Sequence, residues 1–145
     1  MHRKRVIFDC LGLMYLLEPT YAERAIEGGV TVTNITAAEE GESFDQALRD
    51  IDTVHEAIAT SSILMLVTKT SHIREAKRLG KLGIFLGTQG SDVVGREMNR
   101  VSILDRLGVE YVGLAYTGAT LLADGSGETR NAGLSFLGPE FIDVV

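Results

Sequence analysis

The stretch GIFLGTQGS, Gly83–Ser91, joins an apolar run to a turn of small residues that carries a single amide, Gln89. The run is too short for a buried helix and is typical of a strand buried in a parallel sheet. Such a strand delivers the polar residue at its end to a pocket. The choice of glutamine also bears on the chemistry, because a carboxylate can bridge metal ions whereas an amide offers one neutral oxygen.

Four further apolar runs, rich in β-branched residues, alternate with amphipathic segments along the chain. With the run above, the expected strands are Val6–Leu11, Val30–Thr36, Ile63–Thr68, Leu82–Thr88 and Val109–Tyr116. The expected helices are Tyr21–Glu27, Phe44–Thr60, His72–Leu79 and Val94–Leu107. This alternation predicts repeated βα units and a parallel sheet.

Local signals mark several helix ends. Gly28-Gly29, Gly80 and Gly108 each precede an expected strand, and each predicts a left-handed residue that closes a helix. Ser43, with Gln46 three residues later, predicts a capping box at the start of the 44–60 helix.

Composition excludes several classes of protein. The chain has 145 residues, of which 45% are hydrophobic, and this is enough for one core of ordinary size. A net charge of −6 argues against a nucleic-acid partner. No window approaches the eighteen or so apolar residues of a membrane helix. The single cysteine, Cys10, excludes an intramolecular disulfide and fits a reducing cytoplasm. We therefore expect a cytoplasmic protein with neither nucleic acid nor membrane as a partner.

Short motifs follow one another in a fixed order over nearly the whole chain. They are Phe8-Asp9, Ile51–His55, Thr70–Ala76 leading to Gly80-Lys81, Gly87–Ser91, Leu107–Tyr111 and Asn131–Gly138. This ordered set resembles the renal or membrane dipeptidase family of zinc dipeptidases, which are (β/α)₈ barrels. The resemblance implies an α/β fold, a partial TIM-type (β/α)₈ barrel with about the first five βα units. Residues 1–145 would then be the N-terminal portion of the barrel domain, truncated at its C-terminus.

The resemblance also implies an altered metal site. Family members that cleave dipeptides have His and Asp ligands at the end of the first strand, where this chain has Leu11 and Leu13. The bridging Glu of the fourth strand corresponds to Gln89. A substrate-contacting His aligns with Tyr116, followed by Thr117 where Asn is usual. Zinc is thus implied by the resemblance only, and the residues themselves predict no cofactor.

The expected pocket lies at strand ends. Its candidate residues are Asp9, Cys10, Asn34, Gln89, Tyr116 and Thr117. An acid such as Asp9 is costly to bury unless it is paired, so it either anchors a polar network or faces the pocket. Cys10 lacks a neighbouring histidine as a base, which favours a buried small residue over a nucleophile.

Other polar residues leave two interpretations open. Glu39 and Glu40 would supply a carboxylate at the barrel mouth or be solvated. Asp124, Glu128 and Arg130 would orient a charged ligand or form a salt bridge that orders their loop. His72 is better explained as an early residue of an exposed helix than as a replacement metal ligand.

Two functions are consistent with these residues. The first is the family activity, metal-dependent hydrolysis of dipeptides. The second is a non-catalytic or metal-independent barrel that binds a small polar, dipeptide-like ligand. Five parallel strands cannot close a barrel of eight-strand geometry, so exposed sheet edges are expected. The chain alone would then form a homo-oligomer, aggregate, or be completed by further sequence.

Overall fold

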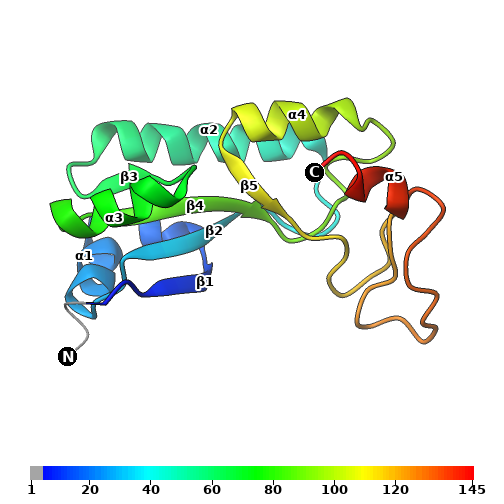
Figure 1. Cartoon of the computed structure of the whole chain (residues 1–145), viewed down its shortest axis with the longest axis horizontal. Helices are drawn as coiled ribbons and strands as arrows, with labels where there is room; N and C mark the ends of the chain where they lie inside the picture. The colour runs from blue at the N-terminus through cyan, green and yellow to red at the C-terminus, as the bar shows by residue number, and fades with distance from the viewer. Residues whose placement is uncertain (1–4) are drawn as a thin grey trace. The chain divides into compact units, whose positions relative to one another are not determined.

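The computed structural model of the chain describes residues 5–145 and has an α/β fold in which strands and helices alternate (Figure 1). The strands are β1 (Phe8–Gly12), β2 (Val32–Ala38), β3 (Leu64–Leu66), β4 (Leu82–Thr88) and β5 (Val109–Val112). The helices are η2 (Met14–Leu17, a 3₁₀ turn), α1 (Pro19–Glu27), α2 (Phe44–Thr60), α3 (Thr70–Leu79), α4 (Asn99–Arg106) and α5 (Gly138–Ile142). Every expected strand and helix is present, and β4 and α2 have the expected bounds.

Several elements are shorter than their sequence patterns predict: β1 begins at Phe8 and β3 covers only Leu64–Leu66, and β5 and α4 are shortened as well. Strand β5 ends at Val112, not at Tyr116. The next residue, Gly113, still donates its N–H to Thr88 O of β4 at 3.0 Å. Helix α4 begins at Asn99, not near Val94. The residues before it form turns closed by the Val94 N–H to Ser91 O hydrogen bond, with Gly95 at φ +59°.

The chain divides into two compact units. Unit 1 comprises the described part of Met1–Thr36 together with Ile51–Leu86. Unit 2 comprises Ala37–Asp50 and Gly87–Val145. Strands β2 and β4 and helix α2 each continue from one unit into the other.

Strand β4 is at the centre of the sheet. The strand order is β1-β2-β4-β3, and β5 also pairs with β4. The β1/β2 and β3/β4 pairs are parallel, with Leu64 opposite Leu82. Strand β2 follows one edge of β4, from the Gly83 N–H to Thr31 O bond (2.8 Å) to the Gln89 N–H to Ala38 O bond (2.9 Å). Strands β3 and β5 therefore share the other edge, so the strands do not pair in simple sequence order.

Burial follows from these positions in the sheet. Six of the seven β4 residues are buried, as expected of a strand covered on both faces. In β1, by contrast, only Gly12 is buried and the other four residues are exposed. The exposed Phe8 ring packs edge-on against Phe85 of β4, with 5.3 Å between the ring centroids. Strand β1 is thus an edge strand with apolar side chains in contact with solvent.

Helix α2 shows how local signals set element boundaries. Ser43 Oγ accepts a hydrogen bond from the Gln46 N–H at 3.2 Å, which confirms the expected N-cap. The capping box is only half formed, because the Gln46 side chain bonds to Asp50 and Arg49 instead of returning to Ser43. At the end of α3, Gly80 has φ +67°, as the left-handed helix end required.

The exposed edge leads to a prediction about association. We expect the 145-residue chain to self-associate, since an apolar edge strand with unpaired backbone groups recruits further strands. Leu11, 67% exposed on β1, should contribute, and Leu11→Lys should shift the chain towards monomer in size-exclusion chromatography with light scattering. The matched control is Leu79→Lys at an exposed position of α3, which should leave the association unchanged. A compact wild-type monomer would contradict the prediction.

Candidate functional site

Unit 1 holds the candidates from the first two strands. Asn34 of β2 donates from Nδ2 to the Cys10 carbonyl oxygen of β1 at 3.2 Å, so these two candidates are in contact. The other side-chain atom of this amide, Asn34 Oδ1, is buried and has no hydrogen-bond partner among the described residues. A buried carbonyl oxygen without a donor carries an energetic cost, and this marks Asn34 as an incompletely satisfied position.

The remaining β1 candidates face solvent. Cys10 is exposed, so the expectation that it is a buried small residue is wrong: edge strand β1 leaves its side chain uncovered. Asp9 is also exposed, and its Oδ1 accepts the Leu11 N–H at 3.1 Å within the same strand. It therefore needs no buried partner. Leu11 and Leu13 are 67% and 47% exposed and offer no metal-binding atom.

Unit 2 holds Gln89, which directly follows β4. Its backbone N–H continues the ladder to Ala38 O at 2.9 Å. Its side-chain Oε1 accepts the backbone N–H of Glu40 at 3.3 Å. Gly113 passes so close that a Cβ at this position would overlap the backbone oxygen of Gln89. The end of β4 is therefore held between the segments that follow β2 and β5.

Glu40 joins Gln89 to the long loop after β5. Its carboxylate Oε1 accepts a hydrogen bond from the Gly118 N–H, 78 residues away in the sequence. The next residue, Gly41, donates its N–H to Asp92 Oδ2 at 3.1 Å. Glu39 is exposed, whereas Glu40 is half-buried. The sequence left open whether Glu39 or Glu40 supplies a carboxylate next to the strand ends. Glu40 does so, because its carboxylate binds the Gly118 N–H, whereas Glu39 is exposed.

Tyr116 and Thr117 lie immediately before Gly118. The Tyr116 carbonyl oxygen accepts hydrogen bonds from Ser126 N–H at 2.7 Å and Ser126 Oγ at 3.0 Å. The Thr117 carbonyl oxygen accepts the Gly127 N–H at 2.8 Å. Their backbones are thus held by the returning loop, while both residues are exposed.

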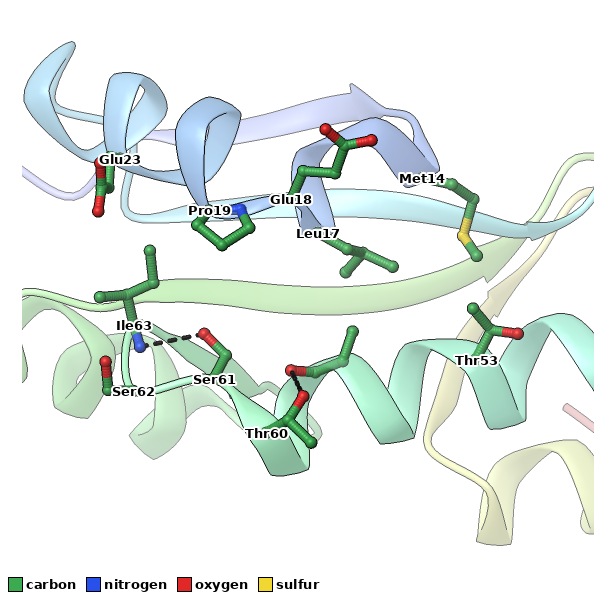
Figure 2. A pocket seen from close by; sticks show the side chains of 11 residues that line it. Met14, Leu17, Glu18, Pro19, Glu23, Thr53, Thr60, Ser61, Ser62 and Ile63 are labelled. Carbon is green, nitrogen blue, oxygen red and sulfur yellow. Dashed lines mark hydrogen bonds between the residues drawn. The ribbon is translucent and has the colours of Figure 1, made fainter.

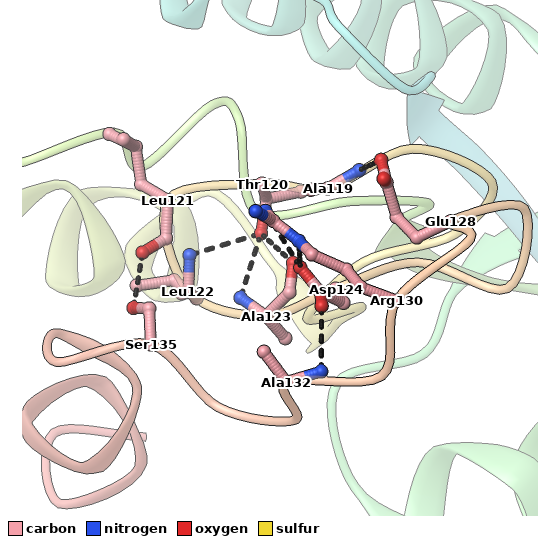
Figure 3. Close-up of polar contacts among 10 residues, drawn as sticks. All are labelled: Ala119, Thr120, Leu121, Leu122, Ala123, Asp124, Glu128, Arg130, Ala132 and Ser135. Carbon is pink, nitrogen blue, oxygen red and sulfur yellow. Dashed lines mark hydrogen bonds and ion pairs between the residues drawn. The ribbon is translucent and has the colours of Figure 1, made fainter.

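Charged residues order the loop by bonding to its backbone. Figure 3 shows Asp124 paired with Arg130 at 3.2 Å and accepting the Ala132 N–H at 2.8 Å, while Glu128 Oε1 accepts the Ala119 N–H at 2.9 Å. The hydrogen bond from Ala132, assisted by Arg130, lowers the pKa of the Asp124 carboxyl. The salt bridge that orders the loop is therefore present.

His72 has a local structural role. Its Nδ1 accepts the Thr68 N–H at 3.3 Å, which ties the first turn of α3 to a residue two positions before the helix begins. Throughout residues 5–145, no three His, Cys, Asp or Glu side chains lie close enough together to hold one metal ion. In the same part of the chain, no helix has the length and apolarity needed to cross a membrane.

Unit 1 also contains a cavity of about 570 Å³ between the start of α1 and the end of α2. Figure 2 shows Leu17, Pro19 and Ile63 on its wall. Ser61 Oγ there accepts the Ile63 N–H at 3.2 Å, and the Thr60 hydroxyl donates to Glu56 O at 2.8 Å. These hydroxyls stabilise the end of α2. The cavity precedes β3, whereas sites in βα barrels form at the carboxyl ends of strands.

Solved structures with the same fold are longer than this chain. An amidohydrolase from Pseudomonas aeruginosa superimposes with a TM-score of 0.89 at 27% identity, covering 99% of this chain and 43% of its own. The probable dipeptidase PvdM from the same organism gives 0.77 at 16% identity, covering 98% and 44%. A metallopeptidase from Rhodobacter sphaeroides, liganded with a phosphinate mimic of the dipeptide L-Ala-D-Ala, gives 0.72 at 14%, covering 95% and 55%. The chain thus spans about half the length of these structures.

The match to these longer structures identifies the fold as part of a TIM-type (β/α)₈ barrel. The chain belongs to the membrane dipeptidase family, peptidase family M19, whose family model matches residues 19–144. No curated protein matches the sequence.

The lowered pKa of Asp124 leads to a prediction about pH. Its carboxylate binds the Ala132 N–H and Arg130 more strongly when ionised, so this added contribution is complete above the unfolded-state pKa and is lost as pH falls through the lower folded-state pKa. We expect amide exchange of the 124–133 segment, corrected for intrinsic rates, to accelerate on acidification below about pH 4. In Asp124→Asn, which cannot ionise, the acceleration in this segment should be absent. An unchanged acid response of that variant would refute the assignment.

Proposed function

We propose that the chain is the N-terminal portion of a membrane-dipeptidase-family barrel that binds a small, dipeptide-like molecule without the zinc pair of the family. Family membership and the R. sphaeroides structure, liganded with a dipeptide mimic, support a ligand of this size and kind. The carboxyl ends of parallel strands are where such barrels bind their ligands. Gln89 in unit 2 directly follows β4, and Tyr116 and Thr117 follow the end of β5 at Val112, whereas Asp9, Cys10 and Asn34 in unit 1 lie within β1 and β2.

The observation that carries this proposal is the hydrogen bond from the Glu40 N–H to Gln89 Oε1 at 3.3 Å. The amide oxygen is the one side-chain atom of Gln89 suited to a hard or borderline metal ion. It is neutral and already accepts the Glu40 N–H, so it is a poor replacement for a carboxylate that bridges two ions. Leu11 and Leu13 add no ligand. The residues of this chain therefore do not fit a family-type binuclear metal site.

In this proposal the chain orients its ligand by neutral groups. The Gln89 amide and the Tyr116 hydroxyl supply hydrogen bonds at the strand ends. The bonds from Glu40 to Gly118, and from Ser126 and Gly127 to the carbonyl oxygens of Tyr116 and Thr117, hold the loop in place. A preorganised loop lowers the entropic cost of binding a small ligand.

The alternative function is metal-dependent hydrolysis, which family membership favours. Within residues 5–145, no three His, Cys, Asp or Glu side chains lie close enough together to hold a metal ion. Hydrolysis would therefore require imidazole or carboxylate ligands from outside these residues. Metal content distinguishes the two functions.

We expect the purified chain to contain well under one zinc ion per molecule by elemental mass spectrometry, and to leave L-Ala-D-Ala intact when zinc is added. Gln89→Glu alone should not create tight zinc binding, because the first-strand ligands remain aliphatic. Gln46→Glu, a glutamine-to-glutamate change on α2, is the matched control. Two zinc ions per chain, or tight zinc binding by Gln89→Glu, would overturn the proposal.

A further inference from the structure

We infer that Gln89 recognises a neutral amide carbonyl oxygen of the ligand, to which it donates a hydrogen bond from Nε2. This inference rests on the proposed function and specifies the group that is recognised.

The orientation of the Gln89 amide follows from its partner. A backbone N–H can only donate, so the side-chain atom 3.3 Å from Glu40 N must be the oxygen. The usual ambiguity between the oxygen and nitrogen of an amide is thereby removed. With Oε1 engaged, the side chain presents the two N–H groups of Nε2 to its surroundings. Gln89 therefore offers donors, and its ligand must supply an acceptor.

These donors are available to a ligand. Within residues 5–145, Nε2 makes no hydrogen bond, and it is not among the buried polar atoms that lack a partner. Gln89 is half-buried, with its backbone fixed to Ala38 in the ladder. The position of the donor is therefore set by the sheet, while the donor itself remains accessible. A donor group is positioned more precisely by a strand of the sheet than by a mobile loop.

Neighbouring charges select a neutral acceptor over an anionic one. Glu40, whose N–H binds Gln89, carries a carboxylate that accepts the Gly118 N–H. Asp92, three residues after Gln89, places its carboxylate on the N–H of Gly41. Glu40 contacts Gln89 through its backbone, and Asp92 contacts the residue after Glu40, so the negative charge of these two carboxylates disfavours a ligand carboxylate at Gln89 by like-charge repulsion. A neutral carbonyl avoids this repulsion, and the peptide bond of a dipeptide supplies one.

Glu40 acts here as a positioning residue. Its backbone N–H orients the Gln89 amide, and its carboxylate holds Gly118, the residue after Thr117. One residue thereby fixes the direction of the donor and the loop next to it. The sequence places these three segments far apart, since Gln89 is 49 positions after Glu40.

The test combines ligand and protein changes. The ligand is L-Ala-D-Ala, compared by calorimetry with its alkene isostere, in which CH=CH replaces the peptide bond and removes the carbonyl. We expect the wild-type chain to bind the isostere about tenfold more weakly, as the loss of one hydrogen bond predicts. Gln89→Glu, which still accepts the Glu40 N–H but has no donor when ionised, should bind L-Ala-D-Ala about tenfold more weakly and show no preference between the two ligands.

Two further variants complete the design. Gln89→Met is neutral and separates the lost donor from the added charge, so it should also lose the preference. Gln46→Glu adds the same charge on α2 and should keep the full tenfold preference. C-terminal amidation of the dipeptide, which removes its carboxylate charge, should leave the preference of the wild-type chain intact.

The outcomes separate this inference from the proposed function. Equal binding of both ligands by the wild-type chain, or an undiminished preference in both Gln89 variants, would overturn the inference and leave the proposed function standing. Loss of the preference on amidation would assign the acceptor to the carboxylate and also overturn it. Failure of the wild-type chain to bind any of these ligands would overturn the proposed function and the inference together.

Discussion

The hydrogen-bond demand of strand β4 is the constraint on which the other elements depend. A strand with six of seven residues buried cannot leave backbone N–H and C=O groups without partners, because water does not reach them. Strand β2 satisfies one edge, and β3 and β5 divide the other between them. The parallel arrangement in turn requires crossover segments, which are the helices between these strands. Helix α2, with Ile51 and Val54 buried, is one of them.

The same ladder generates the site. Because β2 and β4 end together at the Gln89 to Ala38 bond, the residues that follow each strand meet. Glu40 and Gln89 are therefore neighbours without any direct relation in sequence. Their contact uses the oxygen of Gln89, and its nitrogen has no hydrogen-bond partner among residues 5–145. The pairing of β2 with β4 thus sets which way the Gln89 side-chain amide faces. With its oxygen bonded to Glu40, the amide presents its nitrogen as a donor for a carbonyl oxygen.

Four carboxylates in unit 2 hold the backbone of neighbouring loops. Glu40, Asp92, Glu128 and Asp124 each accept an N–H from a loop residue. Hydrogen bonds to an ionised acceptor are stronger than neutral ones, so a few of them can order a glycine-rich loop without regular secondary structure. This explains why acids gather in a segment that lacks a metal-binding cluster among the described residues.

The sequence by itself determined the elements and their caps. The bounds of β4 and α2, the Ser43 cap and the left-handed Gly80 depend on neighbours within a few residues, where periodicity and backbone preference act. Tertiary structure alone decided that β4 pairs with β2 and not only with β3, that Cys10 is exposed on an edge strand, and that Glu40 contacts Gly118. These features depend on which strand pairs with which edge of its neighbour in the sheet. That pairing is between segments distant in sequence, so it cannot be predicted from a local sequence pattern.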